Sequence, residues 1–362
     1  MDKKFVMGIA AMAALTLVSC SSDDLDSFSD NSSKNEAISF DGYLGRSAVA
    51  VNGTRGSELT KDALQTSTEG FGVFGHYKEA DGKEFGSDLF NNQQVTYKTS
   101  AWTYSPLKFW PTQGHIDFLA YAPYDSKYND KVNKDNQKLE FEVVHEIENQ
   151  KDLLWANNAV GQTKDNNSKT KVKFHFYHAL SRLGYTVKLY GNGDYSSNKA
   201  TFTVNKITLA GSADGTKNAF YKKGTIDLSK ANEAGDLWDT SLSSTNEGKL
   251  KFDLVSNQLL DKNGINSGKE YLFVIPQNFS QEGNTLYVCV QYTINYSDGT
   301  SSVTNTVYKK LTTNFKQGKA YMLNLTLGLP IEFDVEVVED WKAPEDGTGD
   351  INIGSNDTPW ER

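Results

Sequence analysis

Residues 331–337 read Ile331-Glu332-Phe333-Asp334-Val335-Glu336-Val337, and this alternation is the pattern that decides the fold. Every second side chain is apolar, and each side chain between them is acidic. Because a strand places successive side chains on opposite faces of a sheet, the segment predicts a half-buried antiparallel strand. Runs with the same period recur at residues 37–43, 71–77, 115–121, 171–176, 184–190, 271–275 and 286–294.

Short turn-forming sequences separate these runs. Asp81-Gly82, Asp214-Gly215 and Asn263-Gly264 are typical of the tight turns that join antiparallel strands. Only residues 58–65 indicate a helix, of one or two turns. Many short strands with frequent turns predict an all-β protein built of antiparallel β-sandwiches rather than a fold in which strands alternate with helices.

Changes in composition predict the domain boundaries. Strand patterning stops at residues 161–170, where positions 163–168 contain no apolar side chain. We expect a signal peptide at 1–19, a flexible polar linker at 20–35, an N-terminal sandwich at 36–164, a C-terminal sandwich at 165–341 and a C-terminal tail at 342–362.

The first twenty residues predict export and lipidation. Lys3 and Lys4 precede an apolar run that is shorter than the roughly 20 residues of a membrane-spanning helix. The run ends in Leu17-Val18-Ser19-Cys20, which resembles the lipobox of bacterial lipoproteins, in which the cysteine thiol receives a diacylglycerol. An ordinary signal peptide with an unrelated cysteine is the alternative. The acidic segment 21–26 resembles the tract that sends lipoproteins of Bacteroidetes-type bacteria to the cell surface.

Composition argues against several classes of function. The net charge is −9 and no run of Lys and Arg forms a basic stripe, so we expect no nucleic-acid partner. Once Cys20 is acylated, Cys289 is the only cysteine left, and its alternating surroundings predict a buried, unreactive thiol.

No sequence motif predicts a metal site or a catalytic centre. The closest histidines, His175 and His178, are three positions apart, and on a strand they face opposite sides. There is no Gly-x-Ser-x-Gly, no phosphate-binding glycine loop and no His-Glu-x-x-His. We therefore expect no cofactor, no metal and no enzymatic activity, with a hydrolase as the weakest alternative because acidic residues are abundant.

Several segments resemble the fimbrillin-like (Mfa-like or FimA-like) surface proteins of Bacteroidales. They occur in the expected order at residues 109–123, 151–156, 174–183 and 318–327, followed by Trp341. The resemblance implies two tandem transthyretin-like β-sandwich domains and a role in type V pili on the outer membrane.

The resemblance also implies how such a subunit assembles. An arginine-specific protease cuts the loop after the first strand, and the emptied groove accepts a strand from a neighbouring subunit. Ile38 and Phe40 alternate with polar residues on the strand that would be removed. Arg55 is the first candidate for the cleavage site and Arg46 the second, although both also fit ordinary surface positions. The candidate donor residues are Ile331, Phe333, Val335 and Val337, with the tail beyond Trp341 as the alternative donor.

The implied partners are other fimbrial subunits, the outer membrane through the lipid on Cys20, the protease, and ligands on host or bacterial surfaces. A role as stalk, anchor or tip stays open. A surface glycan-binding lipoprotein is the alternative function, and it would need several aromatic side chains exposed together on one face. Aromatic residues also fill the cores of sandwiches, so their abundance alone does not decide between the two.

Overall fold

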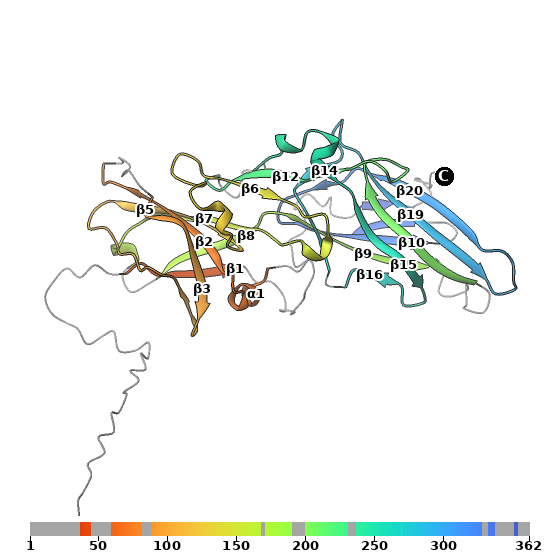
Figure 1. Cartoon of the computed structure of the whole chain (residues 1–362), viewed down its shortest axis with the longest axis horizontal. Coiled ribbons are helices and arrows are strands. Elements are labelled where there is room, and N and C mark those ends of the chain that lie inside the picture. The colour runs from red at the N-terminus through yellow and green to blue at the C-terminus, as the bar shows by residue number, and fades with distance from the viewer. Residues whose placement is uncertain are drawn as a thin grey trace, which may run out of the picture. The chain divides into compact units, whose positions relative to one another are not determined.

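The computed structural model describes residues 37–44, 59–81, 88–167, 171–189, 200–230, 237–268, 270–327, 332–336 and 351–353. The predicted signal peptide, linker and lipidation site lie outside these residues. The elements of the described chain are overwhelmingly strands, which confirms the all-β prediction. Figure 1 shows the arrangement of the strands along the chain.

The first sheet contains the N-terminal strands and is curled. Its order is β1 (Phe40–Leu44), β8 (Val172–His178), β7 (Leu154–Gln162), β5 (His115–Ala122), β2 (Phe71–Lys78), β3 (Phe90–Lys98) and β4 (Ala101–Thr103). The curl brings the chain just before β1 back toward the segment after β4, where Ala37 forms a β-bridge with Phe109.

Alternating side chains explain how this sheet encloses its core. On β8, Val172, Phe174 and Phe176 are buried, whereas the residues between them are exposed. Buried side chains from each of the seven strands meet inside the curl and form a cluster rich in aromatic rings, which we call the first-strand core. It includes Ile38, Phe40, Phe71, Phe90, Trp102, Phe118, Phe174 and Phe176.

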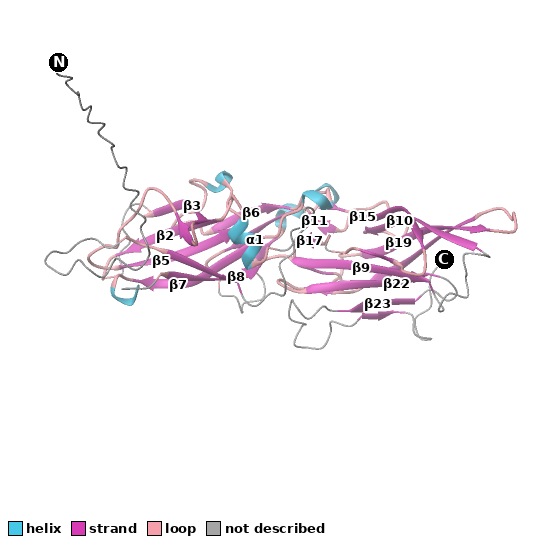
Figure 2. Cartoon of the chain, turned by 90° about the horizontal axis from the view of Figure 1, so that it is seen from below, coloured by secondary structure: helices cyan, strands magenta, loops and turns pink. Residues whose placement is uncertain are grey.

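Two further sheets build the C-terminal part of the chain. One has the order β15 (Phe252–Leu260), β10 (Ala200–Ala210), β19 (Leu286–Tyr296) and β20 (Val303–Leu311). The other has the order β16 (Ile265–Asn266), β9 (Ser181–Leu189), β22 (Ala320–Leu327), β23 (Glu332–Glu336) and β24 (Ile351–Ile353), and β17 (Leu272–Val274) also pairs with β9. Figure 2 shows the two sheets as separate layers, and buried side chains from both meet in one large hydrophobic core.

Three small sheets complete the strands. They are β13 (Trp238–Asp239) with β12 (Lys223–Asp227) and β6 (Lys138–Glu142); β11 (Phe220–Tyr221) with β14 (Lys249–Leu250); and β18 (Gln277–Asn278) with β21 (Asn314–Phe315). The pairing of β6 with β12 joins a strand from before the predicted boundary to one from after it.

The placement of β8 differs from the predicted division at residue 164. Val172–His178 follows that position in sequence, yet it pairs with β7 and β1 in the first sheet. The polar stretch at 163–168 contains a short 3₁₀ turn, Asp165–Asn167, so its loss of apolar residues marks a surface turn between neighbouring strands.

In the part of the chain that the structure describes, helices are few and short. The predicted helix near residues 58–65 is α1 (Lys61–Thr66), which begins where the Thr60 hydroxyl accepts a hydrogen bond from the Ala63 N–H (3.1 Å). The remaining helical turns are Ser126–Tyr128, Ile147–Asn149, Ser241–Ser243 and Asn246–Gly248. Within the described ranges, no helix has the length and apolar character needed to span a membrane.

Candidate functional site: the groove that holds the first strand

The backbone of β1 is held at the edge of the first sheet. It runs parallel to β8, with Phe40 opposite Val172 and Gly42 opposite Phe174. The Val172 N–H donates to the Ser39 carbonyl (2.9 Å), which extends this pairing by one residue. Because β1 ends the sheet, its pairing to another strand is on one side only in the described chain.

A short segment crosses the other side of β1, and we call residues 104–109 the strap. The Ile38 N–H donates to the Lys108 carbonyl (2.8 Å), and the Tyr104 hydroxyl donates to the Ile38 carbonyl (2.7 Å). The Lys108 ammonium lies 4.9 Å from the centre of the Phe90 ring. Burial lowers the pKa of Lys108, and burial raises the pKa of Tyr104 against the opposing effect of its hydrogen bond with the Lys108 backbone. The strap therefore closes the groove over the start of the strand.

Ile38 and Phe40 are buried side chains of β1 and of the residues just before it. Each is 1% exposed, whereas Ser39 is half-buried and Asp41 is exposed. The Phe40 ring lies among four aromatic rings, with centroid distances of 5.4 Å to Phe90, 5.4 Å to Tyr104, 5.5 Å to Phe118 and 5.6 Å to Phe174. The alternation predicted for this segment is the one that the structure shows.

Gly42 lies where groove side chains close over the backbone of β1. A Cβ atom placed on Gly42 would lie 3.4 Å from Phe176, 3.7 Å from Phe71 and 3.8 Å from Trp102. These are contact distances, so any side chain larger than a methyl group would have to displace a ring. The groove therefore takes a large side chain at Phe40, and a donor strand with a larger residue at the Gly42 position would have to shift the rings around it.

The chain that follows the undescribed segment 45–58 is anchored by a buried carboxylate. The Leu59 N–H donates to Oδ2 of Asp152 (3.2 Å), and Nδ1 of His178 lies 2.7 Å from the same oxygen. Asp152 is 1% exposed. Candidate cleavage residues Arg46 and Arg55 lie in the undescribed segment, between a strand fixed in the groove and an end fixed by Asp152.

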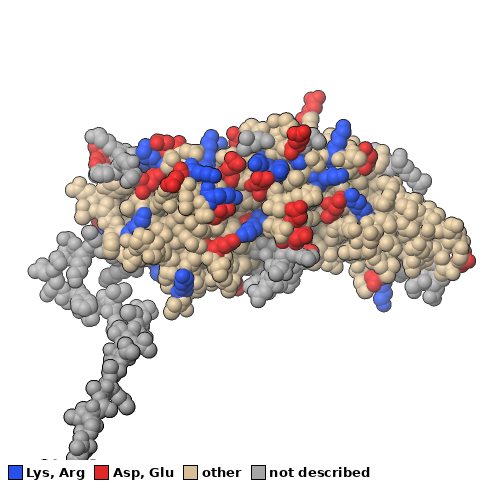
Figure 3. Space-filling view, in the orientation of Figure 1, with Lys and Arg blue, Asp and Glu red and all other residues tan. Residues whose placement is uncertain are grey.

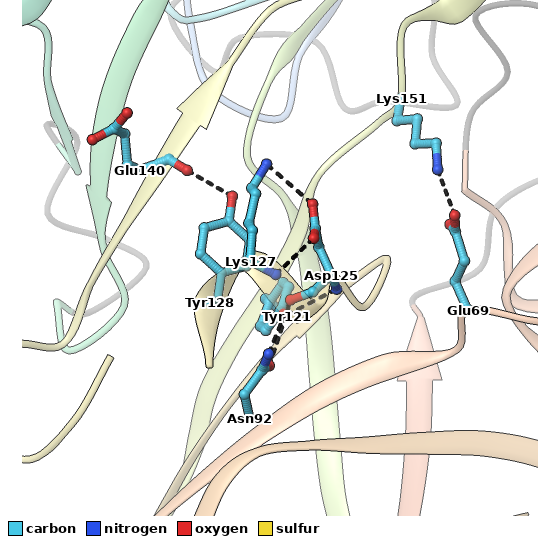
Figure 4. Close-up of polar contacts among 8 residues, drawn as sticks. All are labelled: Glu69, Asn92, Tyr121, Asp125, Lys127, Tyr128, Glu140 and Lys151. Carbon is cyan, nitrogen blue, oxygen red and sulfur yellow. Dashed lines mark hydrogen bonds and ion pairs between the residues drawn. The ribbon is translucent and has the colours of Figure 1, made fainter. Parts of the chain in front are cut away.

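Tyr121 orders a loop next to the first sheet. Its hydroxyl donates to Oδ1 of Asn92 (2.7 Å) and accepts from the Asp125 N–H (3.1 Å), and Nδ2 of Asn92 donates to Oδ1 of Asn129 (2.7 Å). Burial raises the pKa of Tyr121. Figure 4 shows the contacts of Tyr121 with Asn92 and Asp125 together with the bond from the Tyr128 hydroxyl to the Glu140 carbonyl (2.6 Å). Tyr121 in segment 109–123 is therefore a structural residue.

Two of the four candidate donor residues lie on a described strand. Phe333 and Val335 are on β23, opposite Leu325 and Leu323 of β22, and Val335 is also opposite Ile351 of β24. The strand predicted at 331–337 is thus present at its centre, and the short strand of the tail pairs beside it. Ile331, Val337 and Trp341 lie outside the described residues.

The structure also shows the surroundings of Cys289. Cys289 is buried, and its thiol contacts the Ala213 carbonyl (Sγ to O, 3.2 Å). Burial, together with the charge of Asp214, raises the pKa of this thiol to about 11. No group of three potential metal ligands occurs in the part of the chain that the structure describes.

The sequence did not predict the strap or the Asp152 anchor. Tyr104, Lys108 and Asp152 contact backbone atoms that are distant in sequence, and no local period marks them. Segment 151–156 contains Asp152, but its resemblance to the family assigned no role to this residue. The one available signal was the position of Asp152 directly before an apolar run, because a carboxylate that is buried beside such a run needs hydrogen-bonding partners.

Comparison with known proteins agrees with this architecture. A fimbrial protein from Bacteroides vulgatus is similar with a TM-score of 0.59 and 23% identity, covering 84% of this chain and 99% of that one, which shows a shared fold. A candidate cell adhesion protein from Bacteroides uniformis has a TM-score of 0.46 and 16% identity, covering 85% and 99%. No curated protein matched the chain. The sequence profile of the fimbrillin-like family matches residues 54–341. That match spans most of the sequence, so the predicted resemblance is confirmed and the chain belongs to the fimbrillin-like family.

Proposed function

We propose that this protein is a structural subunit of a bacterial surface fimbria, and that it assembles when its first strand is replaced by a strand from a neighbouring subunit. The observation that carries the proposal is the position of Phe40. Its ring fills an aromatic groove, while the strand that bears it pairs with only one other strand of the described chain. Such a strand is deeply bound through its side chains, yet its removal breaks few strand-to-strand hydrogen bonds.

The energetics favour replacement over an empty groove. Full burial of two apolar side chains of this size contributes roughly 3–6 kcal/mol, at about 1.5–3 kcal/mol each. That is comparable to the whole stability of a marginal domain. Without Ile38 and Phe40, the first-strand core would open to water, and an incoming strand with alternating apolar residues would restore it.

The uncut chain stays monomeric in this proposal. Its own strand is tethered beside the groove and competes at high effective concentration against any strand from another molecule. Cleavage by an arginine-specific protease at Arg55, or at Arg46, removes this advantage. The proposed donor is the alternating segment with Ile331, Phe333, Val335 and Val337, or the tail beyond Trp341.

The proposed location is the outer surface of the outer membrane. A lipid on Cys20 holds the precursor there, and cleavage after the first strand releases the subunit from the lipid. The partners are other fimbrial subunits, the protease and ligands on host or bacterial surfaces. The protein acts as a structural component in this proposal and not as an enzyme.

The test is cleavage of a purified precursor that spans residues 21–362. An arginine-specific protease should convert the wild-type monomer into fibres that are visible by electron microscopy. The double variant Arg46→Lys and Arg55→Lys keeps both charges, resists the protease and should stay monomeric. Arg182 provides an internal control, because it is buried against Tyr271 and should remain uncut. Fibres from the double variant, or cut wild type that stays monomeric, would overturn the proposal.

A further inference from the structure

The outer face of the β15–β10–β19–β20 sheet carries a continuous row of uncharged side chains. Leu259, Thr203, Thr293 and Thr304 lie opposite one another across the four strands. Their neighbours along each strand, including Leu260, Phe202 and Tyr292, are buried in the large core, so this row faces outward. In the adjacent row, Gln291 lies between Thr306 of β20 and Lys206 of β10, so this row contains one charged side chain.

We call these outward residues the neutral face: Thr203, Gln291, Thr293, Asn295, Thr304 and Thr306. All six are half-buried or exposed. The Thr293 hydroxyl lies 2.9 Å from the Thr304 hydroxyl and donates to Oδ1 of Asn205 (2.8 Å), so the hydroxyls form an ordered network. In Figure 3 the charged side chains gather over the middle of the molecule, and the surface over the outer ends of these four strands is nearly free of them.

Two tyrosine rings stand on the same outward side. Tyr287 of β19 and Tyr308 of β20 are both half-buried, and their centroids are 6.0 Å apart with the planes inclined by 70°. Tyr308 is two residues from Thr306 on the same strand. The charged residues beside these rings include Lys206 and Asp253, which form an ion pair (3.1 Å), and Lys310, which lies opposite Tyr287 on β20.

An open hollow of about 500 Å³ borders the neutral face at the end of β15. Amide side chains of Gln258, Asn263 and Asn266 line it together with the apolar side chains of Leu259 and Ile265, and Asp261 adds one carboxylate. Leu259 is 61% exposed and belongs to both the hollow and the threonine row. The hollow therefore continues the neutral face around the edge of the sheet.

We propose that the neutral face and this hollow bind an uncharged glycan chain. Hydroxyl and amide groups donate and accept hydrogen bonds as sugar hydroxyls do, and they need no opposite charge in the ligand. The tyrosine rings and Leu259 offer apolar surface for the C–H faces of sugar rings. The charges that border the face are few and of both signs, with Lys206 paired to Asp253, Lys310 opposite Tyr287 and Asp261 in the hollow. They do not form the basic cluster that would attract sulfated or uronic-acid polymers.

The dimensions of the face favour a glycan over a protein. Four strands at about 4.8 Å spacing and about six residues at 3.4 Å each give an area of roughly 300 Å². A stable protein interface needs roughly 800 Å² from each partner, and its centre is rich in aromatic side chains rather than threonine. A second copy of this chain stacked on the face would therefore bind poorly, whereas a short stretch of polysaccharide covers it.

This inference rests on the proposed fimbrial role, because it names the class of surface ligand that such a subunit would hold. The binding itself requires neither cleavage nor assembly. The neutral face lies entirely on strands of the C-terminal sheets, whereas the first-strand groove is in the first sheet. The two proposals can therefore fail independently.

The experiment uses the uncut protein, residues 21–362, on a printed array of neutral and acidic glycans. We expect binding to a class of neutral glycans and none to heparin or hyaluronan. The double variant Thr304→Lys and Thr306→Lys places two charges on exposed positions of the face and should weaken binding at least tenfold. Thr103→Lys, an exposed threonine on β4, is the matched control and should bind as wild type does.

A second variant separates loss of binding from loss of folding. Gln291→Ala removes one exposed amide from the face without adding a charge, and it should weaken binding while circular dichroism stays unchanged. The Arg46→Lys and Arg55→Lys variant should bind glycans fully, and cut Thr304→Lys and Thr306→Lys protein should still form fibres. Wild type that binds no neutral glycan, binds only acidic ones, or binds equally well after the face is charged would overturn the inference.

Discussion

The ring of Phe40 stacks on the ring of Phe174, with their centroids 5.6 Å apart and their planes inclined by 27°. Phe174 lies on β8, the strand with which β1 forms its parallel ladder. Most of the chain between the two strands must therefore be in place before the groove is complete. The groove is filled by one edge strand, and this is the strand that is exchanged in the proposed assembly.

Truncation of the Phe40 ring should destabilise the uncut protein strongly. Phe40→Ala removes a fully buried aromatic side chain from among four rings, and such changes cost about 3–5 kcal/mol. Urea unfolding followed by tryptophan fluorescence measures the loss. Asp41→Ala is the control on the same strand, and its effect should stay within about 0.5 kcal/mol because the side chain is exposed. Equal effects of the two variants would contradict the groove as described.

The Tyr104 hydroxyl should help the strap to hold the start of the first strand, beside the hydrogen bond from the Ile38 N–H to the Lys108 carbonyl. Tyr104→Phe removes the donor to the Ile38 carbonyl and should cost about 0.5–1.5 kcal/mol, the usual net value of such a bond. The amide proton of Ile38 should also exchange faster with solvent, as measured by hydrogen exchange. Tyr97→Phe is the matched control, because the Tyr97 ring packs on Trp102 at 5.1 Å but its hydroxyl makes no hydrogen bond within the described residues. An unchanged exchange rate in Tyr104→Phe would exclude this role.

Local patterns predicted the strands, and long-range contacts determined how they join. The alternation of Ile38 and Phe40 was sufficient to identify a strand with one buried face, because period two is a property of the backbone. The pairing of that strand with β8 could not be predicted, since many apolar strands offer equivalent partners. The predicted domain boundary near residue 164 differs from the end of the first sheet for a related reason. A polar turn between adjacent strands has the same composition as a linker.

The thiol of Cys289 should be nearly inert in the folded protein. Burial raises its pKa from 9.0 to about 11, with a further contribution from Asp214. At pH 8.5 this shift leaves roughly 100-fold less thiolate than in the unfolded chain, since each pKa unit is a factor of ten. Iodoacetamide should therefore modify residues 21–362 slowly in buffer and quickly in guanidinium chloride, as followed by mass spectrometry. Similar rates in the two conditions would mean that the thiol is accessible.

The same shift has a consequence for stability at alkaline pH. A folded-state pKa above the unfolded value favours the neutral thiol in the native protein, so this contribution is complete below about pH 9 and is lost as the pH rises toward 11. Cys289→Ser should flatten the decline in melting temperature between those pH values. If the melting temperature declines with the same slope in wild type and variant, the decline comes from other buried groups.

Lipidation at Cys20 should determine membrane attachment. In cells, Cys20→Ala should yield unacylated protein that separates from the membrane fraction, because two acyl chains are sufficient for stable anchoring. Mass spectrometry of the mature N-terminus measures the modification directly. Ser19→Ala is the control, since it keeps the cysteine and a small residue before it. An unmodified N-terminus at another position in wild type would rule out the lipid anchor.

The alternating segment around β23 should compete for the emptied groove. A peptide of residues 330–338 can offer its apolar face to the first-strand core through Phe333 and Val335, which alternate as Ile38 and Phe40 do. Added in excess during cleavage of the wild-type precursor, it should occupy the groove and shorten or abolish the fibres. The peptide with Phe333→Ala and Val335→Ala keeps the same charges but loses about 3–6 kcal/mol of apolar burial, so it should not compete. Fibre length by electron microscopy provides the measurement. If both peptides leave assembly unchanged while residues 351–362 block it, the tail is the donor instead.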